Sequence, residues 1–336
     1  TMYHRLSSRL AACAAVLCLG VVVSHFVGYA RVKDETWVPT GLASGTLPGP
    51  VTEILAAPGD AGRLLARSGN DLYHTVNGGA EWAAVSGLVD RPVNMVRHPT
   101  NPQWLVAVRV TPAAVTAGLP RSSDGGQTWQ VIPGSDSLVP TVSSLAFSSD
   151  GSYLFLAPNW MNTIYRSADN GTTWQTVLTD TELKPGLWCS PVTPTRCLSG
   201  SHVTDDAGTT WQPLTAPTGF RELSAAAFSA SAPATLYALA PWDDGYRLLI
   251  STSGGQSFDF VATTMRFDAG QHGKPPVLWV NPVDARSIVL ASGGNLVRSA
   301  DGGATFSQLS APAASDIRAP AVFLAGSTEN ILNTQI

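Results

Sequence analysis

Charged side chains are scarce in this 336-residue chain, and lysine is the scarcest of them. Asp, Glu, Lys and Arg together make up 13% of the residues, and only three of the 20 basic residues are lysines. Soluble domains average about 25% charged residues. Broad nucleic-acid-binding surfaces need clustered cations that displace the counterions of phosphates. Because the formal net charge is −4, we expect no nucleic-acid partner.

Cysteine and histidine are also few, with four and six copies. The sequence has no haem-attachment signature, no phosphate-binding loop and no pair of Cys or His at zinc-ligand spacing. We therefore expect no cofactor and no metal site. Cys13 and Cys18 fall in an apolar stretch, whereas Cys189 and Cys197 are spaced as on two neighbouring strands of a hairpin. An oxidising compartment would join this second pair in a disulfide, and two free buried thiols are the alternative.

One long apolar run lies near the N-terminus. Residues 10–30 contain no charged side chain and are framed by Arg9 and Arg31. At about 1.5 Å per residue, such a helix would cross the roughly 30 Å hydrocarbon layer. We expect a retained transmembrane signal anchor. A cleaved signal peptide ending near Ala30 and a lipoprotein signal at Cys13 are the alternatives.

The anchor predicts how the rest of the chain is divided. A short basic segment before the apolar run favours a cytoplasmic N-terminus and an extracytoplasmic, periplasmic bulk. Residues 1–9 would form a cytoplasmic extension, 10–30 the anchor, 31–50 a linker or outer closing strand, and 51–336 one β-sheet domain. We expect the 10–30 helix to pack against integral membrane subunits.

Glycine, proline and tryptophan are plentiful, and they follow a repeat. An eight-residue motif (a hydroxyl residue, any, Asp, any, Gly, any, Thr, aromatic) begins at Ser122, Ser167, Thr204 and Ser299. Weaker copies begin at Thr75 and Ser251, where Asn77 and Ser253 replace the aspartate. The final aromatic residues, at positions 82, 129, 174, 211, 258 and 306, recur every 37 to 48 residues. This period is typical of β-propeller blades.

The motif is suited to a tight turn between two strands. Asp can accept hydrogen bonds from backbone N–H groups inside the turn, Gly supplies a positive φ, and the aromatic side chain packs on a neighbouring layer. We assign a structural role to the twelve residues Asp124, Gly126, Trp129, Asp169, Gly171, Trp174, Asp206, Gly208, Trp211, Asp301, Gly303 and Phe306.

Short runs of β-forming residues precede each motif. They predict an all-β propeller of four-stranded blades over 51–88, 92–135, 140–180, 183–216, 220–263 and 275–312. Residues 321–324 and 331–334 predict two inner strands, and 36–39 predict an outer one. Together they would close a composite seventh blade from both termini, so six and seven blades both stay open.

The motif resembles the Asp-box (BNR) repeat found in sialidases, xyloglucanases, sortilin-type receptors and photosystem II assembly factors. The resemblance covers roughly residues 51–312 and implies a propeller with these turns at the blade periphery. A sialidase would add an arginine cluster, a Tyr–Glu pair and an Arg-Ile-Pro element, and the last is absent. Asp243 and Asp244 are a candidate catalytic or calcium-binding pair, or simply the cap of a solvated hairpin.

Length variation between blades is concentrated in four connections, at 110–120, 158–162, 241–246 and 262–276. Aromatic and Met side chains there are interface candidates, namely Trp160, Met161, Trp242, Tyr246 and Met265. The alternative is that they fill small cores of their own loops. We predict a non-catalytic assembly or accessory subunit of a multi-subunit membrane complex of the photosynthetic reaction-centre kind, with extrinsic protein partners on this face. An Asp-box glycoside hydrolase and a sortilin-like receptor are the alternatives.

Overall fold

The computed structural model describes residues 29–31, 37–39, 51–57, 60–68, 71–86, 91–110, 118–138, 143–158, 161–243, 245–262, 267, 277–292, 295–309, 317–325 and 328–335. The chain divides into two compact units. The larger unit is Ser86–Leu309, and the smaller unit combines Thr1–Val85 with Ser310–Ile336.

The larger unit contains five four-stranded antiparallel sheets, numbered here blades 2 to 6. Blade 2 consists of β7 (Arg91–Arg97), β8 (Leu105–Val110), β9 (Pro120–Ser122) and β10 (Gln130–Val131). Blade 3 consists of β11 (Ser143–Phe147), β12 (Leu154–Pro158), β13 (Thr163–Ser167) and β14 (Gln175–Thr179). Blade 4 consists of β15 (Leu187–Cys189), β16 (Cys197–Ser199), β17 (His202–Thr204) and β18 (Gln212–Pro213).

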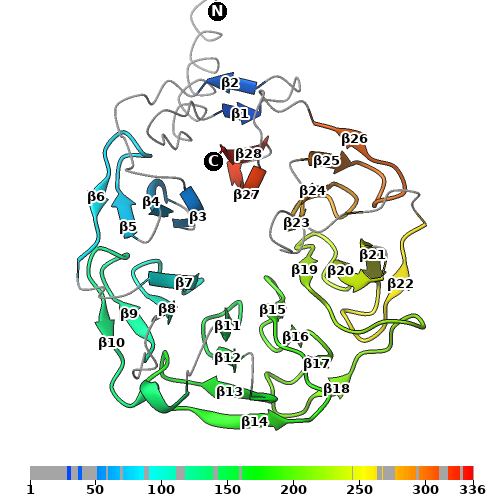
Figure 1. Cartoon of the computed structure of the whole chain (residues 1–336), viewed down its shortest axis with the longest axis horizontal. Helices are drawn as coiled ribbons and strands as arrows, with labels where there is room; N and C mark the ends of the chain where they lie inside the picture. The colour runs from blue at the N-terminus through cyan, green and yellow to red at the C-terminus, as the bar shows by residue number, and fades with distance from the viewer. Residues whose placement is uncertain are drawn as a thin grey trace, which may run out of the picture. The chain divides into compact units, whose positions relative to one another are not determined.

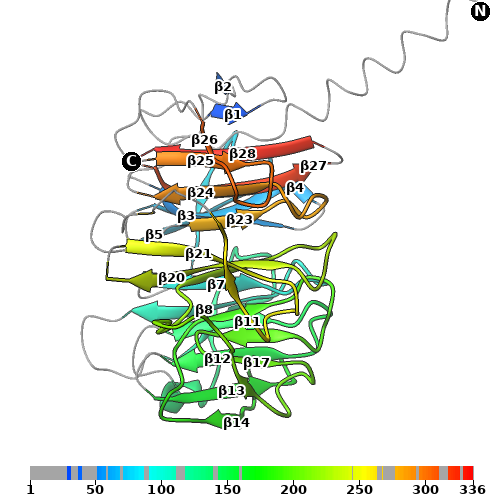
Figure 2. The same cartoon turned by 90° about the vertical axis from the view of Figure 1, so that its right-hand side faces the viewer.

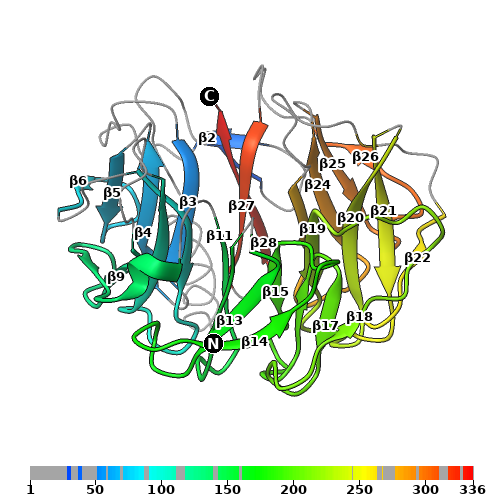
Figure 3. The same ribbon diagram turned by 60° about the horizontal axis from the view of Figure 1, so that its bottom comes forward.

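Blade 5 consists of β19 (Ala225–Phe228), β20 (Leu236–Trp242), β21 (Gly245–Ser251) and β22 (Asp259–Phe260). Blade 6 consists of β23 (Val277–Val280), β24 (Ile288–Ser292), β25 (Asn295–Ser299) and β26 (Ser307–Gln308). Within this unit the first strands of the blades follow one another along one side and the last strands along the other (Figure 1). Figure 3 shows the four strands of blade 5 in their chain order, from β19 to β22.

The smaller unit contains blade 1 and a sheet built from both termini. Blade 1 consists of β3 (Val51–Ala57), β4 (Asp60–Ser68), β5 (Asp71–Thr75) and β6 (Ala83–Ala84). The other sheet has the order β2 (Trp37–Pro39), β1 (Tyr29–Arg31), β28 (Thr328–Gln335) and β27 (Ile317–Ala325). The long hairpin of β27 and β28 is seen from the side in Figure 2, and both strands contact β3.

The apolar core of the larger unit lies between successive blades. In one cluster, Val106 and Leu119 of blade 2 pack with Leu145, Leu154 and Leu156 of blade 3. Three further clusters join blades 3 and 4, 4 and 5, and 5 and 6 in the same way. Burial of each such side chain contributes about 1.5–3 kcal/mol. The second strand of a blade is therefore apolar on both faces, and all five residues of β12 are buried.

The sequence prediction of an all-β propeller with four-stranded blades is confirmed for six blades. The predicted loop at 241–246 is wrong, because Trp242 pairs with Gly245 and the segment is the tip of the β20–β21 hairpin. The predicted outer strand at 36–39 corresponds to β2, but Tyr29 and Ala30, expected at the end of the anchor, pair with β2 and β28 instead.

The rest of the predicted anchor and the extension at 1–9 lie outside the described residues. Among the residues that are described, no helix is long and apolar enough to span a bilayer.

Candidate functional site

Each turn motif is built around one hydroxyl group and one carboxylate. In blade 2, Oγ of Ser122 accepts a hydrogen bond from N of Gly126 at 2.9 Å and donates one to Oδ1 of Asp124 at 2.8 Å. The same carboxylate accepts bonds from the backbone N of Thr128 at 3.0 Å and from its hydroxyl at 2.5 Å. Equivalent bonds surround Asp169, Asp206 and Asp301. The motif thus satisfies the polar groups of its own turn.

These hydrogen bonds keep the turn carboxylates ionised. Burial by itself would raise the pKa of Asp124, but bonds from hydroxyls and amides of its own turn outweigh burial and lower the pKa from 3.8 to about 2. Bonds led by that from the Thr305 hydroxyl lower the pKa of Asp301 to about 2. The pKa values of Asp169 and Asp206 are lowered by similar bonds, against the opposing effect of burial. Such carboxylates accept hydrogen bonds and are unsuited to act as general acids.

The two weaker copies keep the same arrangement with other side chains. In blade 1, Oδ1 of Asn77 accepts bonds from the Thr75 hydroxyl at 2.8 Å and from N of Glu81 at 3.0 Å. In blade 5, Oγ of Ser253 accepts a bond from N of Ser257 at 2.9 Å. An amide or hydroxyl oxygen can therefore replace the carboxylate in this turn.

The fifth residue of each motif is a glycine, and in blades 3 to 6 it packs against the preceding blade. Gly208 has φ +79°, and a Cβ atom there would lie 2.8 Å from Cε1 of Phe155 in blade 3. Equally close approaches join Gly171 to Ile132, Gly255 to Leu198 and Gly303 to Leu248. Real Cβ atoms do not come this close to carbon, so any side chain would displace its neighbour. The turns are therefore also the joints between blades.

Arginine side chains add a polar contact at two of these joints. Arg121 directly precedes the motif of blade 2, and its Nη1 donates to O of Asn170 at 3.4 Å and to the Thr172 hydroxyl at 3.2 Å in the turn of blade 3. The guanidinium lies over the Trp104 ring, 5.2 Å from the centroid. A cation over an aromatic face contributes about 0.5–1 kcal/mol at exposed sites.

The joint between blades 3 and 4 repeats this arrangement. Nη1 of Arg166 donates to O of Ala207 in the next turn at 2.6 Å, and its guanidinium lies 4.7 Å from the centroid of the Tyr153 ring. Nη2 of the same arginine is 3.5 Å from Oε1 of Gln175. In both blades, therefore, an arginine on the third strand stacks on an aromatic residue before the second strand and reaches the following turn.

Blade 4 departs from this pattern. Its strand register pairs Cys197 with Thr204, as Leu105 pairs with Ser122 and Leu154 with Ser167. By this register, Arg196 occupies the place that an aromatic residue takes in blades 2 and 3, and Val203 occupies the place of the arginine. The basic residue has moved from the third strand to the residue before the second strand.

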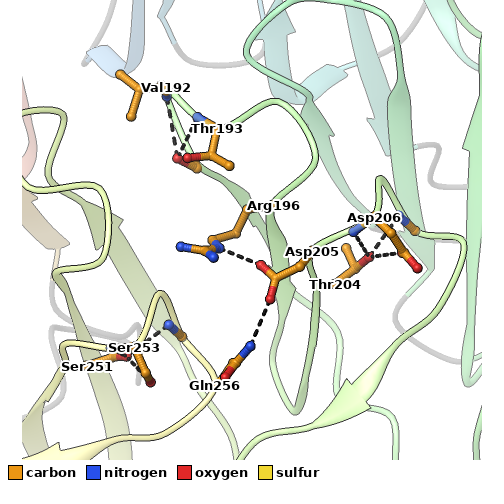
Figure 4. Close-up of polar contacts among 12 residues, drawn as sticks. Val192, Thr193, Arg196, Thr204, Asp205, Asp206, Ser251, Ser253 and Gln256 are labelled. Carbon is orange, nitrogen blue, oxygen red and sulfur yellow. Dashed lines mark hydrogen bonds and ion pairs between the residues drawn. The ribbon is translucent and has the colours of Figure 1, made fainter.

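Arg196 takes part in a different polar chain, shown in Figure 4. Its Nε donates to Oδ1 of Asp205 at 2.5 Å, and Oδ2 of Asp205 accepts a bond from Nε2 of Gln256 at 2.9 Å. Gln256 belongs to the turn of blade 5. A Cβ atom on Gly254 of that turn would collide with the Arg196 guanidinium, 2.0 Å from Nη1. The joint between blades 4 and 5 is thus held through an aspartate and a glutamine.

A cavity of about 440 Å³ lies beside this polar chain. It is lined by Val203, Asp205, Asp206, Thr210, Gln212, Pro213, Thr215 and Gln256. Thr215, which lines the cavity, donates a backbone bond to O of Gln256 and accepts one from N of Phe258, both in the turn of blade 5. The cavity is a candidate binding site.

The structure joins Cys189 and Cys197 in a disulfide between β15 and β16. Cys197 directly follows Arg196, so the cross-link fixes the strand from which this side chain reaches Asp205. Blade 4 contains the shortest interval between motifs, and its strands have two or three residues each. A covalent link replaces part of the packing that a short sheet cannot supply.

Two of the described interface candidates, Trp242 and Tyr246, are partly buried against the core clusters that join blade 5 to its neighbours. The Trp242 ring lies 5.2 Å from that of Phe260, with the Arg247 guanidinium 5.1 Å above it. Tyr246 exchanges backbone bonds with Phe267. Met161 is half-buried, while Trp160 and Met265 lie outside the described residues. Their role in partner binding stays a prediction.

Asp243 lies at the tip of the β20–β21 hairpin, where it accepts a 2.7 Å bond from Arg221. Its side chain is 87% exposed, as expected for the cap of a solvated hairpin. Asp244 lies outside the described residues. Among the residues that are described, no group of three or more His, Cys, Asp or Glu is placed to hold a metal ion.

The residues that distinguish blade 4 were not among the sequence candidates. Their signal lies one position before the motif, where arginine stands at 121, 166 and 298, histidine at 74, valine at 203 and isoleucine at 250. Aligning the repeats over nine residues instead of eight would have shown which blades lack the arginine. The contact between Asp205 and Gln256, 51 residues apart, has no such signal.

Comparison with known proteins shows the fold alone. No protein-family model and no curated protein matches the sequence. Among solved structures, YCF48 from Cyanidioschyzon merolae superposes with a TM-score of 0.57 at 18% identity, over 86% of this chain and 97% of that one. YCF48 bound to a D1 peptide gives 0.56 at 19% identity, over 95% and 96%.

Glycoside hydrolases share the fold as well. The GH74 xyloglucanase from Xanthomonas campestris superposes with a TM-score of 0.61 at 15% identity over 85% of this chain, and an ancestral GH74 enzyme with 0.59 at 16% identity over 84%. This chain spans only 52% and 39% of the lengths of those two enzymes. These likenesses extend to the β-propeller and do not decide the function.

Proposed function

We propose that this protein is a non-catalytic β-propeller that serves as an assembly or accessory subunit of a multi-subunit membrane complex of the photosynthetic reaction-centre kind. The observation that carries the proposal is the state of the two carboxylates in the described cavity. Asp206 is held ionised by its own turn, and both oxygens of Asp205 are occupied by Arg196 and Gln256. Neither is placed as a general acid, which glycoside hydrolysis requires.

The comparisons support a polypeptide as the ligand class. The two YCF48 structures match over 96–97% of their length, whereas the hydrolases match over 39% and 52%. One of those structures holds a D1 peptide. By analogy we propose that this chain binds polypeptide segments of membrane subunits. The binding surfaces would include the propeller face that carries Met161, Trp242 and Tyr246.

The anchor and the terminal sheet are part of the proposal. Residues 10–28, the part of the predicted anchor that precedes β1, would hold the chain in the membrane with the propeller on the periplasmic side. The β2–β1–β28–β27 sheet would act as a seventh blade, a role that its contacts with β3 support. Protease protection in sealed membrane vesicles tests the orientation, because a periplasmic propeller is cut only from that side.

Purification of the full chain in mild detergent tests the function. We expect membrane subunits to be recovered with it. Recovery of the chain alone would overturn the proposal. Release of reducing sugar from xyloglucan or of sialic acid from a sialoside would instead favour the hydrolase alternative, and capture of a soluble ligand without membrane subunits would favour the receptor alternative.

A further inference from the structure

The cavity between blades 4 and 5 lies where the preceding blades carry an arginine. In blade 3, the Arg166 side chain runs beside Gln175 and ends at the carbonyl of the next turn. The same place in blade 4 belongs to Val203, whose side chain is too short to reach that far. Val203 lines a cavity of about 440 Å³.

The groups that surround an arginine in blades 2 and 3 have counterparts around this cavity. Gln212 follows the motif aromatic of blade 4, as Gln175 does in blade 3, and it lines the cavity. Gln256 is the sixth motif residue of blade 5, the position from which Thr172 accepts a bond from Arg121. The polar surroundings have therefore been kept, while the guanidinium that meets the next turn comes from Arg196, beside Gly254, and no longer from the third strand.

The charge of the lining favours a cation. Asp205 and Asp206 both contribute to the wall, and Arg196 offsets only the charge of Asp205. The Asp206 carboxylate stays ionised at neutral pH because its turn holds the pKa low against the effect of burial. Val203 and Pro213 supply an apolar surface for the methylene groups of a long side chain.

We propose that this cavity binds the guanidinium group of an arginine side chain presented by a partner polypeptide. The inference rests on the proposed function, since it names the chemistry that the partner must show. A guanidinium is preferred over an ammonium because its planar donors suit several acceptors at once, as Arg121 and Arg166 do inside the chain.

The test uses the full chain in mild detergent and Nα-acetyl-arginine methylamide as the probe, followed by saturation-transfer NMR. The matched neutral probe is the citrulline analogue, which has almost the same shape. We expect the arginine probe to bind at least about tenfold more tightly, a difference of roughly 1.4 kcal/mol. Equal binding of the two probes, tighter binding of the lysine analogue, or no binding of the arginine probe would overturn the proposal.

Two variants fill the cavity from within. Val203→Arg restores the internal arginine of blades 2 and 3, and Val203→Met fills the space without adding charge. Both are expected to lower probe affinity at least tenfold. Val131→Arg is the control, because it adds the same charge at an exposed position of β10 that does not line the cavity. Unchanged binding by both Val203 variants would contradict the assignment.

The same variants separate this inference from the proposed function. If the wild-type chain recovers membrane subunits and Val203→Arg loses them while Val131→Arg keeps them, the cavity is the docking site. If all three recover the subunits equally, the cavity assignment fails and the assembly role stands. If the wild-type chain recovers none, the assembly role fails, and the arginine-probe measurement still decides whether the cavity recognises a guanidinium.

Discussion

The joints after blades 2 and 3 differ from the joint after blade 4 in the direction of their polar contact. In the first two, an arginine stacked on an aromatic ring donates to the next turn. In the third, an aspartate already paired with Arg196 accepts from Gln256. The glycine contact beneath is the same in all three, since Gly171, Gly208 and Gly255 each meet a core side chain of the preceding blade.

This difference shows which part of the repeat is needed for folding and which part is free to change. The glycine contact recurs wherever a described turn meets the preceding blade of the larger unit. The arginine is replaced in blade 4 without loss of the turn, whose hydrogen bonds all remain. A position that varies while its surroundings are kept is where a binding function can arise.

The largest effect is expected when a joint glycine acquires a side chain. Gly208→Ala combines an unfavourable positive φ with a collision against Phe155. We expect the free energy of unfolding to fall by about 2–4 kcal/mol, measured by chemical denaturation. Gly134→Ala is the control, because φ is also positive, +77°, but nothing lies within 4 Å of the added Cβ. It should cost only about 1 kcal/mol.

Gly255→Ala extends this test to the joint after blade 4, where the added Cβ would lie 2.7 Å from Leu198. A loss as large as that of Gly208→Ala would show that the two kinds of joint share the same packing. A loss no larger than that of the Gly134→Ala control would show that the joint beside the cavity is loose.

Replacing the arginines should distinguish the two kinds of joint by how much stability each variant loses. Arg166→Ala loses the bond to Ala207 and the stacking on Tyr153, so we expect a loss of about 1–2 kcal/mol. Arg196→Ala removes a partly exposed ion pair and should cost about 0.5–1 kcal/mol. Thermal unfolding of both variants, and of the corresponding lysine variants, measures which substitution costs more stability. The reverse order would mean that the Arg196–Asp205 pair dominates its joint.

Acid should weaken the turns. The pKa of Asp124 is about 2 in the folded chain and 3.8 as its ordinary value. Its contribution to stability is therefore fully present above pH 4 and is lost as the pH falls toward 2. Asp124→Asn should flatten the dependence of the melting temperature on pH in this range. An unchanged slope would mean that other carboxylates account for the acid sensitivity.

The smallest effect is expected at Ala207. This residue has φ +57° at a motif position occupied elsewhere by glycine or asparagine. Ala207→Gly removes the strain of the left-handed backbone and should raise the free energy of unfolding by about 0.5 kcal/mol. Asn170→Gly, at the same position in blade 3, should change stability less because asparagine tolerates this conformation. Differential scanning calorimetry of the pair resolves the difference.

Local chemistry made most of the fold predictable from sequence. The hydroxyl, aspartate and glycine of each motif form one turn by themselves, so their spacing located the blades to within a few residues. The tip at 241–246 was missed because its aromatic and Gly residues read as a loop, whereas strand pairing continues to Trp242 and Gly245. The candidate site was missed for a different reason. Its residues come from two blades, and their meeting depends on packing between sheets, which no local pattern encodes.

The pairing of each turn glycine with a side chain of the preceding blade limits how such a molecule can grow by duplication. The pair Phe155–Gly208 spans residues 155–208 and the pair Leu198–Gly255 spans 198–255, so the two spans overlap. If a duplication inserts new sequence at any point between residues 155 and 255, it separates at least one of these glycines from the side chain that it contacts. An additional blade would therefore need two compensating changes of side-chain size, one at its contact with the blade before it and one at its contact with the blade after it, before it could be retained in evolution.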